Sequence, residues 1–415
     1  MKRTGVPSLW RGRTLALLGV LLVAGNLRTA VAALSPIFAE IDGDIGVGSL
    51  GLGLLGMLPP LCFALFGVFT PRMVRRLSLE PVLVIALLTL VAGHFIRAAA
   101  PNFVVLALGS AACFAGIGIG NVVLPPLVKK YFPDRVGLVT SLYATVMSFS
   151  TFIPPLIAVP VADATSWHLS LGLWGILGVL AVFPWLTLLL QERKRKRLAD
   201  PDLDEASPAD RVLVHHSPIA WAVAAVFATS ALNAYAMFAW LPQILRDVSH
   251  VSASEAGILL SLMAAMGVPA SLLIPVLVSK MRNVGVLVYI ASVCFLLGYG
   301  GLILWPTTLT WLWVAFIGLG PLLFPLALIL INLRTATRDG AVALSGFVQS
   351  AGYTIGAAGP LLVSLLHEVT GGWTIPLLFL TVTGVACAFA GVLVGKPTTI
   401  EADLAARARR HPRDR

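Results

Sequence analysis

The sequence predicts an all-α membrane protein of twelve transmembrane helices in two six-helix bundles. Three observations lead to this fold class. Of the 415 residues, 58% are hydrophobic and 12% are charged. Soluble domains carry about a quarter charged residues, so the charged fraction is half the usual one. The apolar residues form twelve runs, each about the 20 residues that a helix needs to cross ~30 Å of hydrocarbon. A long polar stretch divides these runs six and six.

The predicted spans follow one another closely along the chain. They are 14–36, 48–70, 81–100, 102–127, 137–160, 168–190, 219–242, 255–279, 284–304, 308–331, 342–366 and 373–395. The polar stretch QERKRKRLADPDLDEASPADRVLVHHSP begins at residue 191. Its basic run followed by an acidic, Pro-containing run is typical of a flexible linker or of a solvated loop without a binding role. We therefore expect a first bundle over 1–190, a cytoplasmic linker over 191–217, a second bundle over 218–395 and a basic cytoplasmic tail over 396–415.

The basic residues predict the orientation. If the N-terminus lies in the cytoplasm, all of the 29 Lys and Arg except three fall on the inner side. Arg28 lies within a span, and Arg97 and Arg246 are expected outside. The positive-inside rule therefore places both termini in the cytoplasm. The net charge of +10 follows from this topology. Because the basic residues are spread over several inner segments, no nucleic-acid partner is expected.

The two halves contain matching segments. GIGNVVLP at 118–125 aligns with GLGPLLFP at 318–325. NLRTAVAALSP, starting at Asn26, aligns with NAYAMFAWLP, starting at Asn233, and this alignment pairs Arg28 with Tyr235. Both halves run in the same direction along the chain. The matches therefore predict a parallel internal repeat, as in transporters whose two halves are related by an axis along the membrane normal.

Motifs for other chemistry are missing from the sequence. AGVLVGKP at 390–397 lacks the first glycine and the Ser or Thr of a phosphate-binding loop, and neither GxSxG nor HExxH occurs. No cofactor or metal is therefore expected. The cysteines fall inside spans without ligand spacing, so we expect them to pack as small residues. The 19 Asp and Glu all fall at loops or span ends. A midplane acid for proton coupling is therefore not predicted.

Arg28 is the exceptional residue, because it lies near the middle of the first span. A centred Arg costs roughly 2.5–3.5 kcal/mol, so an interaction must offset it. One interpretation is structural: the guanidinium binds carbonyls of a kinked helix and tyrosines. The other is functional: Arg28 faces a water-filled cavity and binds a small anion or a polar, electron-rich solute through its planar fork of donors.

Helical spacing suggests which residues could help Arg28. Asn26 and Arg28 lie on opposite sides of a regular helix, so both can line a cavity only if the helix is distorted. Ser345, Gln349 and Tyr353 form a polar stripe in the eleventh span. The remaining candidates are Asn121 in the fourth span, and Asn233 and Tyr235 in the seventh. The alternative for each amide is a bond to the backbone or to a neighbouring helix.

Several of these stretches resemble one family. Within the major facilitator superfamily, the chain is similar to the cyanate and 2-nitroimidazole transporter (CynX/NimT) group. The matching stretches are NLRTAVAALSP, LPPLCFALFGVFTPRMVRR, GIGNVVLPPLVKKYFP, WLPQIL, FPLALILINLRT, LSGFVQSAGY and GPLL. The resemblance covers nearly the whole chain. It implies a carrier of small solutes in the cell membrane that works by alternating access.

The predicted inner loop between spans 2 and 3, GVFTPRMVRR at 67–76, resembles the superfamily's gating loop. Gly67, Arg72, Arg75 and Arg76 fit that pattern, whereas Pro71 replaces the usual Asp and Val74 the usual Gly. The alternative is that these basic residues only set the topology. Span 5 lacks the GxxxGP pattern of drug/proton antiporters.

The sequence thus predicts a secondary active or facilitative transporter for a small anion or a small polar nitrogen-containing solute, cyanate-like or nitroimidazole-like. The expected partners are this solute and the lipid bilayer, and the chain is expected to be a monomer. One alternative is an exporter of uncharged heterocycles or drugs. Another is a membrane-embedded enzyme or sensor, which the repeat and the absence of a nucleophile–base pair disfavour.

Overall fold

The computed structural model describes residues 13–196 and 214–404, and helices cover nearly all of them. Within these residues, eleven segments are long and apolar enough to cross a bilayer. In addition, α16 (Arg338–Thr370) occupies the eleventh predicted span. The twelve-span, all-helical fold predicted from the sequence is therefore confirmed.

The first half of the chain forms one bundle of six spans. Spans 1 and 6 are each interrupted, and the other four are continuous helices. The elements are α1 (Thr14–Asn26), α2 (Thr29–Ala32), η1 (Ser35–Ile37), α3 (Phe38–Ile45), α4 (Gly48–Leu77), α5 (Leu79–Ala98), α6 (Phe103–Tyr131), α7 (Val136–Ala164), α8 (Trp167–Gly172) and α9 (Trp174–Lys196).

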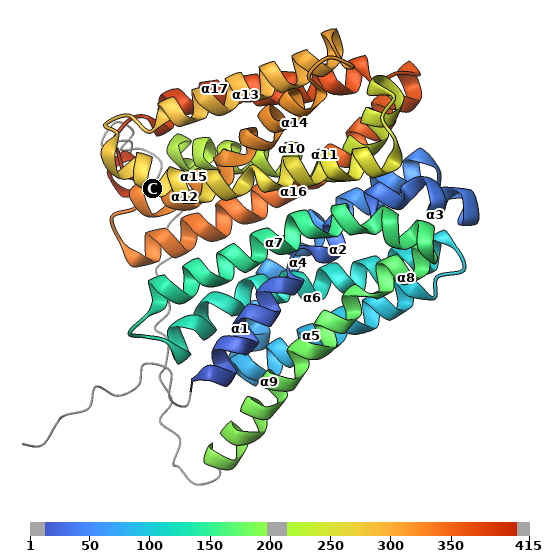
Figure 1. Cartoon of the computed structure of the whole chain (residues 1–415). Helices are drawn as coiled ribbons and strands as arrows, with labels where there is room; N and C mark the ends of the chain where they lie inside the picture. The colour runs from blue at the N-terminus through green and yellow to red at the C-terminus, as the bar shows by residue number, and fades with distance from the viewer. Residues whose placement is uncertain (1–12, 197–213, 405–415) are drawn as a thin grey trace, which may run out of the picture.

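The second half forms the other bundle, and Figure 1 shows the two bundles lying side by side with their long helices running in similar directions. Spans 8 and 10 are interrupted here. The elements are η2 (Val214–His216), α10 (Pro218–Ser249), α11 (Ala253–Ala265), α12 (Gly267–Lys280), α13 (Gly285–Leu304), α14 (Thr310–Leu319), η3 (Gly320–Leu322), α15 (Leu323–Leu333), α16 and α17 (Thr374–Val394). Most of the predicted linker, 197–213, and the end of the predicted tail, 405–415, lie outside the described residues.

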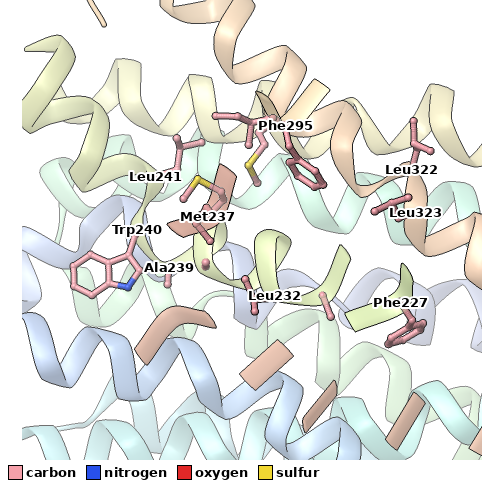
Figure 2. Packing of buried hydrophobic residues seen from close by; sticks show 14 of the residues in the cluster. Phe227, Leu232, Met237, Ala239, Trp240, Leu241, Phe295, Leu322 and Leu323 are labelled. Carbon is pink, nitrogen blue, oxygen red and sulfur yellow. The ribbon is translucent and has the colours of Figure 1, made fainter. Parts of the chain in front are cut away.

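The core of the second bundle is built around α10. Phe227, Met237 and Trp240 of this helix are fully buried, and Phe295 of α13 packs in the same cluster (Figure 2). The indole Nε1 of Trp240 donates a hydrogen bond to the carbonyl of Pro360 at 2.9 Å, which ties α10 to α16. Tryptophan packs well here because its single polar atom finds a partner.

Two matching hydrogen bonds reflect the internal repeat. In the first half, the indole of Trp167, at the start of span 6, donates to Asp44, at the end of span 1, at 2.9 Å. In the second half, Trp373, at the start of span 12, donates to Asp247, at the end of span 7, at 2.8 Å. The same pair of residue types therefore joins equivalent span ends in both bundles.

The expected inner loop at 67–76 is instead helical, which corrects the sequence interpretation. The helix α4 continues through these residues to Leu77, and Ser78 alone links it to α5. Met73 and Val74 pack against the buried core of the first bundle. Because this packing extends beyond the apolar run, hydropathy placed the end of the span too early.

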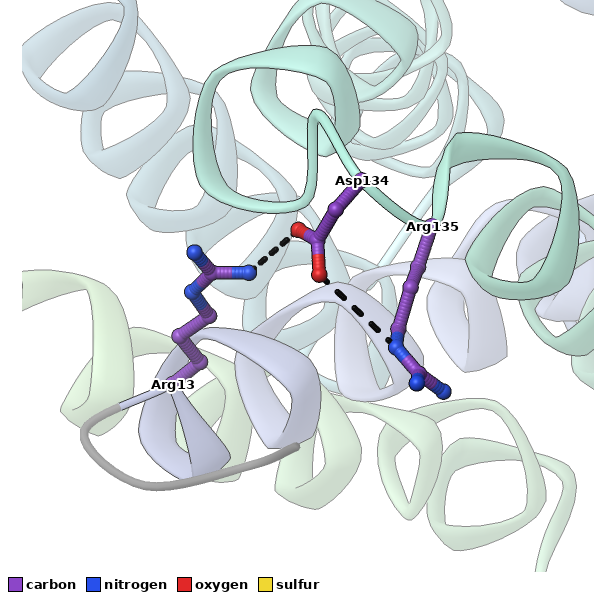
Figure 3. Close-up of polar contacts among 3 residues, drawn as sticks. All are labelled: Arg13, Asp134 and Arg135. Carbon is purple, nitrogen blue, oxygen red and sulfur yellow. Dashed lines mark hydrogen bonds and ion pairs between the residues drawn. The ribbon is translucent and has the colours of Figure 1, made fainter. Parts of the chain in front are cut away.

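Charged residues tie together one end of the first bundle. Arg13 forms an ion pair with Asp134, and Arg135 lies 3.7 Å from the same carboxylate (Figure 3). The hydrogen bond from Arg13 holds the pKa of Asp134 below its ordinary value. On α5, the buried Glu80 accepts hydrogen bonds from Lys130 at 2.6 Å and from Tyr131 at 2.9 Å. We call this end of the molecule, where α1 begins and α9 ends and which the sequence predicts to face the cytoplasm, the inner side.

The two bundles touch closely on the opposite, outer side. Gly53 and Gly56 of α4 lie against α16: a Cβ added at Gly53 would be 2.7 Å from the Cβ of Ser364, and one at Gly56 would be 2.8 Å from Pro360. The hydroxyl of Ser364 also donates to the carbonyl of Ser49 at 3.0 Å. Small residues allow this approach, as in other membrane helix pairs. The outer side is thus closed.

Candidate functional site

The first span is interrupted at Arg28. The helix α1 ends at Asn26, α2 begins at Thr29, and Arg28 between them has φ −132° and ψ −15°. The Asn26 amide donates to the carbonyl of Leu22 at 2.8 Å, and the Thr29 hydroxyl donates to the carbonyl of Asn26 at 3.3 Å. Such side-chain bonds compete with the helical ladder and stabilise an interruption. The helix is thus distorted at the position where a distortion was needed for Asn26 and Arg28 to line one cavity.

A cavity of about 200 Å³ lies between the two bundles at this interruption. The first bundle contributes Arg28 with residues of α7, such as Ser148 and Thr151. The second bundle contributes Tyr235, Phe238 and Tyr353, among others. Both halves of the repeat therefore supply its walls, and Arg28 and Tyr235, which the repeat alignment paired, face the same space.

Aromatic rings surround the guanidinium of Arg28. Its carbon Cζ lies 5.7 Å from the centre of the Phe63 ring, a cation–π arrangement. Phe63 packs edge-on against Tyr235 and Tyr353, with ring centres 6.2 Å and 5.7 Å away. The phenol groups of both tyrosines interact with Arg28. The nitrogen Nη1 of Arg28 is buried without a protein acceptor.

The charge on the described walls of this cavity is positive only. Among the described residues that line it, Arg28 is the one charged side chain, and none is Asp or Glu. The remaining walls are hydroxyl-bearing or apolar. A guanidinium that no carboxylate neutralises, in a site of low dielectric constant, attracts anions and strong hydrogen-bond acceptors. Such a site can bind a small planar solute between aromatic rings and beside a fork of donors.

The two paired asparagines lie elsewhere. Asn233 donates to the carbonyl of Thr229 at 2.9 Å and to the hydroxyl of Thr383 at 3.2 Å, and it accepts from Tyr299 at 2.9 Å. Asn26 points toward α9, where its Oδ1 is 3.6 Å from the Cβ position of Gly178. Neither lines the cavity. Both asparagines are fully buried inside their own bundles, and solute contact by either stays a prediction.

Two other predicted contacts also lie outside the cavity walls. Gln349 donates to the hydroxyl of Ser345 at 2.8 Å, so the polar stripe of α16 bonds partly to itself, and only its last member, Tyr353, lines the cavity. Asn121 lies within α6, and its Nδ2 is buried without a protein partner. Solute contact by Asn121 or Gln349 stays a prediction.

The four predicted gating residues lie on the inner part of α4. Arg72, Arg75 and Arg76 are exposed, and Arg72 donates to the carbonyl of Val68, one turn earlier, at 3.1 Å. No atom lies within 4 Å of a Cβ added at Gly67. The gating role of these residues stays a prediction.

Sequence reasoning missed two residues near Arg28. Phe63 carries no signal, because a phenylalanine in an apolar span is ordinary. Arg97 was expected at the outer surface, but its side chain is fully buried at the end of α5. Its nitrogen Nη1 donates to the carbonyl of Ala30 at 3.1 Å. A mostly apolar run, interrupted by Thr89 and His94, precedes Arg97, and a charge at the end of such a run is a signal that it could be buried.

Cys62, Cys113, Cys294 and Cys387 are all free and buried, as expected of packing residues. Within the part of the chain that the structure describes, no group of three or more His, Cys, Asp or Glu side chains could hold a metal ion.

Comparison with curated proteins gives three full-length relatives. The uncharacterized transporter YycB of Bacillus subtilis (strain 168) is 32% identical over 91% of this chain and 92% of its own length. The 2-nitroimidazole transporter of Escherichia coli (strain K12) is 31% identical over 94% of this chain and 98% of its own. The cyanate transport protein CynX of the same organism is 26% identical over 88% and 92%.

Comparison with solved structures supports the same fold. A bacterial homolog of the human lysosomal transporter Spinster, in an inward-facing and occupied conformation, aligns with a TM-score of 0.72 over 94% of this chain and 97% of that one, at 16% identity. The family model of the Major Facilitator Superfamily matches residues 17–357. Together with the twelve spans, the repeat and the central cavity, this match shows that the chain belongs to the Major Facilitator Superfamily of transporters and resembles its cyanate and 2-nitroimidazole carriers.

Proposed function

We propose that this transporter carries a small anion or a small polar nitrogen-containing solute, cyanate-like or nitroimidazole-like, across the cell membrane by alternating access. The observation that carries the proposal is the cavity between the bundles, in which Arg28 is the one charged side chain among the described lining residues. Its Nη1 is buried with no protein acceptor. A solute that accepts hydrogen bonds would satisfy this donor.

The size and the walls of the cavity support a small planar solute. A volume of about 200 Å³ is well above the ~10–15 Å³ that one water molecule needs by the same measure, so the cavity can hold a small solute. Tyr235 and Tyr353 of the walls offer ring faces and edges beside the guanidinium, and Phe63 packs against both rings from behind the wall. The names of two relatives, which transport cyanate and 2-nitroimidazole, agree with this chemistry.

The second candidate is an exporter of uncharged heterocycles or drugs. The aromatic walls favour it, because they can stack on a ring without any net charge. In that case Arg28 would donate hydrogen bonds to nitro or ring-nitrogen acceptors. The two candidates differ in charge dependence, since an anion needs the full charge of Arg28 whereas a neutral ring needs only a donor.

Several features of the cycle belong to the same proposal. Because the described lining residues include no carboxylate, we expect the solute gradient, the membrane potential or exchange to drive transport. Gly67, Arg72, Arg75 and Arg76 would act at the inner gate. The solute would cross without chemical change, so the chain would not be an enzyme. It would work as a monomer in the lipid bilayer with both termini in the cytoplasm, without a cofactor and without nucleic acid.

The test is a set of Arg28 variants in purified protein. We expect Arg28→Lys to bind cyanate or 2-nitroimidazole about ten-fold or more weakly, because a point charge replaces a planar fork. Arg28→Gln should lose cyanate binding but keep its melting temperature, since it removes a costly buried charge. For a neutral heterocycle, Arg28→Gln should retain part of the affinity.

The matched control is Arg246→Gln, which removes an exposed arginine near the outer end of α10 and should leave binding unchanged. Binding and melting temperature are measured on the same preparations. If Arg28→Gln melts lower while its folded fraction binds both solutes normally, Arg28 is structural and the proposed site is wrong.

A further inference from the structure

Arg97 belongs to the wall behind the cavity rather than to the cavity itself. It lies in the last turn of α5, and its side chain is fully buried. Its Nη1 donates to the carbonyl of Ala30 at 3.1 Å. Ala30 is in α2, two residues after Arg28. A charged residue of the third span thus bonds to the short helix that follows the interruption in the first.

The carbonyl of Ala30 needs such a partner, because α2 is only one turn long. The carbonyl of Thr29 accepts from the amide of Ala33 at 3.1 Å, which closes this turn, and the chain then changes to the 3-10 turn η1. The last carbonyls of a helix have no partner within it. A buried carbonyl left in this state is unfavourable, so the bond from Arg97 helps to fix where α2 ends and how it is oriented.

The helix that carries Arg97 is itself held rigidly. A Cβ added at Gly109 of α6 would lie 2.9 Å from the backbone nitrogen of Arg97, and one at Gly93 would lie 2.6 Å from the backbone nitrogen of Cys113. The ring of His94 lies on the same helix, and its Nδ1 is 3.2 Å from the carbonyl of Leu171. The helices α5 and α6 therefore pack closely against each other, and Arg97 extends from this pair to α2.

We propose that Arg97 is a positioning residue for solute binding. By bonding to Ala30 it fixes α2, and α2 with the interruption before it directs the side chain of Arg28 into the cavity. Arg97 does not line the cavity itself, so its effect passes through Arg28. This inference rests on the proposed role of Arg28 in binding solute.

A structural role and a positioning role differ in their effect on stability. The Nε and Nη2 nitrogens of Arg97 are buried with no protein acceptor. Replacing Arg97 by an apolar residue of similar length removes these unsatisfied donors together with a buried charge. Arg97→Met leaves the carbonyl of Ala30 unpaired, but the removal of a buried charge with two unsatisfied donors outweighs this cost. The variant should therefore keep or raise the melting temperature while it frees α2.

The experiment compares Arg97→Met with Arg97→Lys, whose ammonium can still donate to the carbonyl of Ala30. We expect Arg97→Met to bind cyanate and 2-nitroimidazole at least ten-fold more weakly with no fall in melting temperature. Arg97→Lys should recover most of the affinity. The control is Arg246→Met, which also exchanges an arginine near the outer side and should bind normally.

A second readout follows α2 directly and needs no solute. Ala32→Cys places a thiol on α2 at the cavity wall. The rate at which this thiol reacts with a water-soluble maleimide is measured in two chains. One carries Ala32→Cys alone, and the other carries Ala32→Cys together with Arg97→Met. We expect the rate to rise several-fold in the double variant, because α2 has lost its anchor. The chain without the added cysteine gives the background rate.

The outcomes separate this inference from the proposed function. Unchanged solute affinity in Arg97→Met, or an unchanged maleimide rate, overturns the positioning role. A fall in melting temperature that Arg97→Lys does not repair overturns it as well, because it marks a purely structural residue. If the Arg28 variants bind solute normally, the proposed function fails, while the maleimide rate still tests whether Arg97 holds α2.

Discussion

Phe63 has two roles around Arg28. Its ring lies under the guanidinium, and its edge contacts join α4 to the tyrosines of α10 and α16. A cation–π contact away from water contributes up to about 2 kcal/mol. Phe63 thus helps to offset the cost of a charge in the middle of the membrane, and it holds the rings around the charge.

We expect Phe63→Leu to lower solute affinity by roughly five- to thirty-fold, which corresponds to ~1–2 kcal/mol, because the ring under Arg28 is lost. Phe149→Leu is the control, since Phe149 is 48% exposed on the outside of α7. Equilibrium binding of cyanate or 2-nitroimidazole by both variants is the measurement. Equal affinities in the two variants would show that Phe63 does not contribute to the site.

At the scale of single residues, the sequence predicts where a buried charge lies better than it predicts which way a polar side chain faces. Arg28 could be predicted because a charge in an apolar run is costly, and Tyr235 because the repeat aligns it with Arg28. Asn233 has the same kind of signal, but it bonds to Thr229, Thr383 and Tyr299 inside its own bundle. Composition does not distinguish a polar group that faces a cavity from one that faces a neighbouring helix.

At the scale of elements, the described part of the C-terminal tail is docked rather than free. The amide of Ile400 donates to the carbonyl of Arg334 at 2.8 Å. The carboxylate of Glu401 accepts hydrogen bonds from the amides of Ala336 and Thr337 at 2.9 Å and 3.2 Å. The tail therefore binds the segment that leads into α16, the helix that carries Tyr353.

The pKa of Glu401 determines how the stabilisation from this contact changes with pH. Partial burial acts to raise the pKa, but the hydrogen bonds from Ala336 and Thr337 outweigh it and hold the pKa below its ordinary value. A carboxyl group with a lowered pKa stabilises the folded state above its ordinary pKa, and this contribution is lost as the pH falls through the lowered value. We expect Glu401→Gln to cost about 1 kcal/mol at pH 7, as for other capping groups. Melting temperatures of the two chains should converge as the pH falls through the lowered pKa of Glu401, and a constant difference would contradict this account.

Element ends were the least predictable part of the fold. Hydropathy ended the second span at residue 70, whereas α4 runs to Leu77 because Met73 and Val74 still pack on the core. The sequence indicates a helix distortion at Arg28 only as the condition under which Asn26 and Arg28 could line one cavity. Its cause is a set of local side-chain bonds from Asn26 and Thr29, which compete with the helix by small free energies. Apolar length predicts that a span exists but not where its helix breaks.

At the scale of the whole molecule, the contacts between the bundles differ from one side to the other. On the outer side, Gly53 and Gly56 of α4 lie against Ser364 and Pro360 of α16. The same faces of both helices continue toward the inner side, where they carry Gly67 and Gly346, about three and five turns away. Nothing lies within 4 Å of a Cβ at either glycine. The close contact between α4 and α16 on the outer side is therefore not repeated at these two glycines, and the sequence does not encode this choice because states with either side closed differ by only a few kcal/mol.

Alternating access requires the inner parts of α4 and α16 to approach each other in the opposite state. We expect Gly67→Leu and Gly346→Leu to fold with unchanged melting temperature, because their side chains enter open space. Both should slow transport in liposomes at least ten-fold, because the added side chains block inner closure, while solute still binds from the inner side.

Gly56→Leu should act in the opposite way: its side chain would meet Ala239 and Pro360, open the outer side and expose the cavity there. Gly300→Leu is the control, since Gly300 of α13 also has nothing within 4 Å and lies on a helix that packs within its own bundle. Native transport rates in both inner variants would mean that α4 and α16 do not close against each other through these glycines.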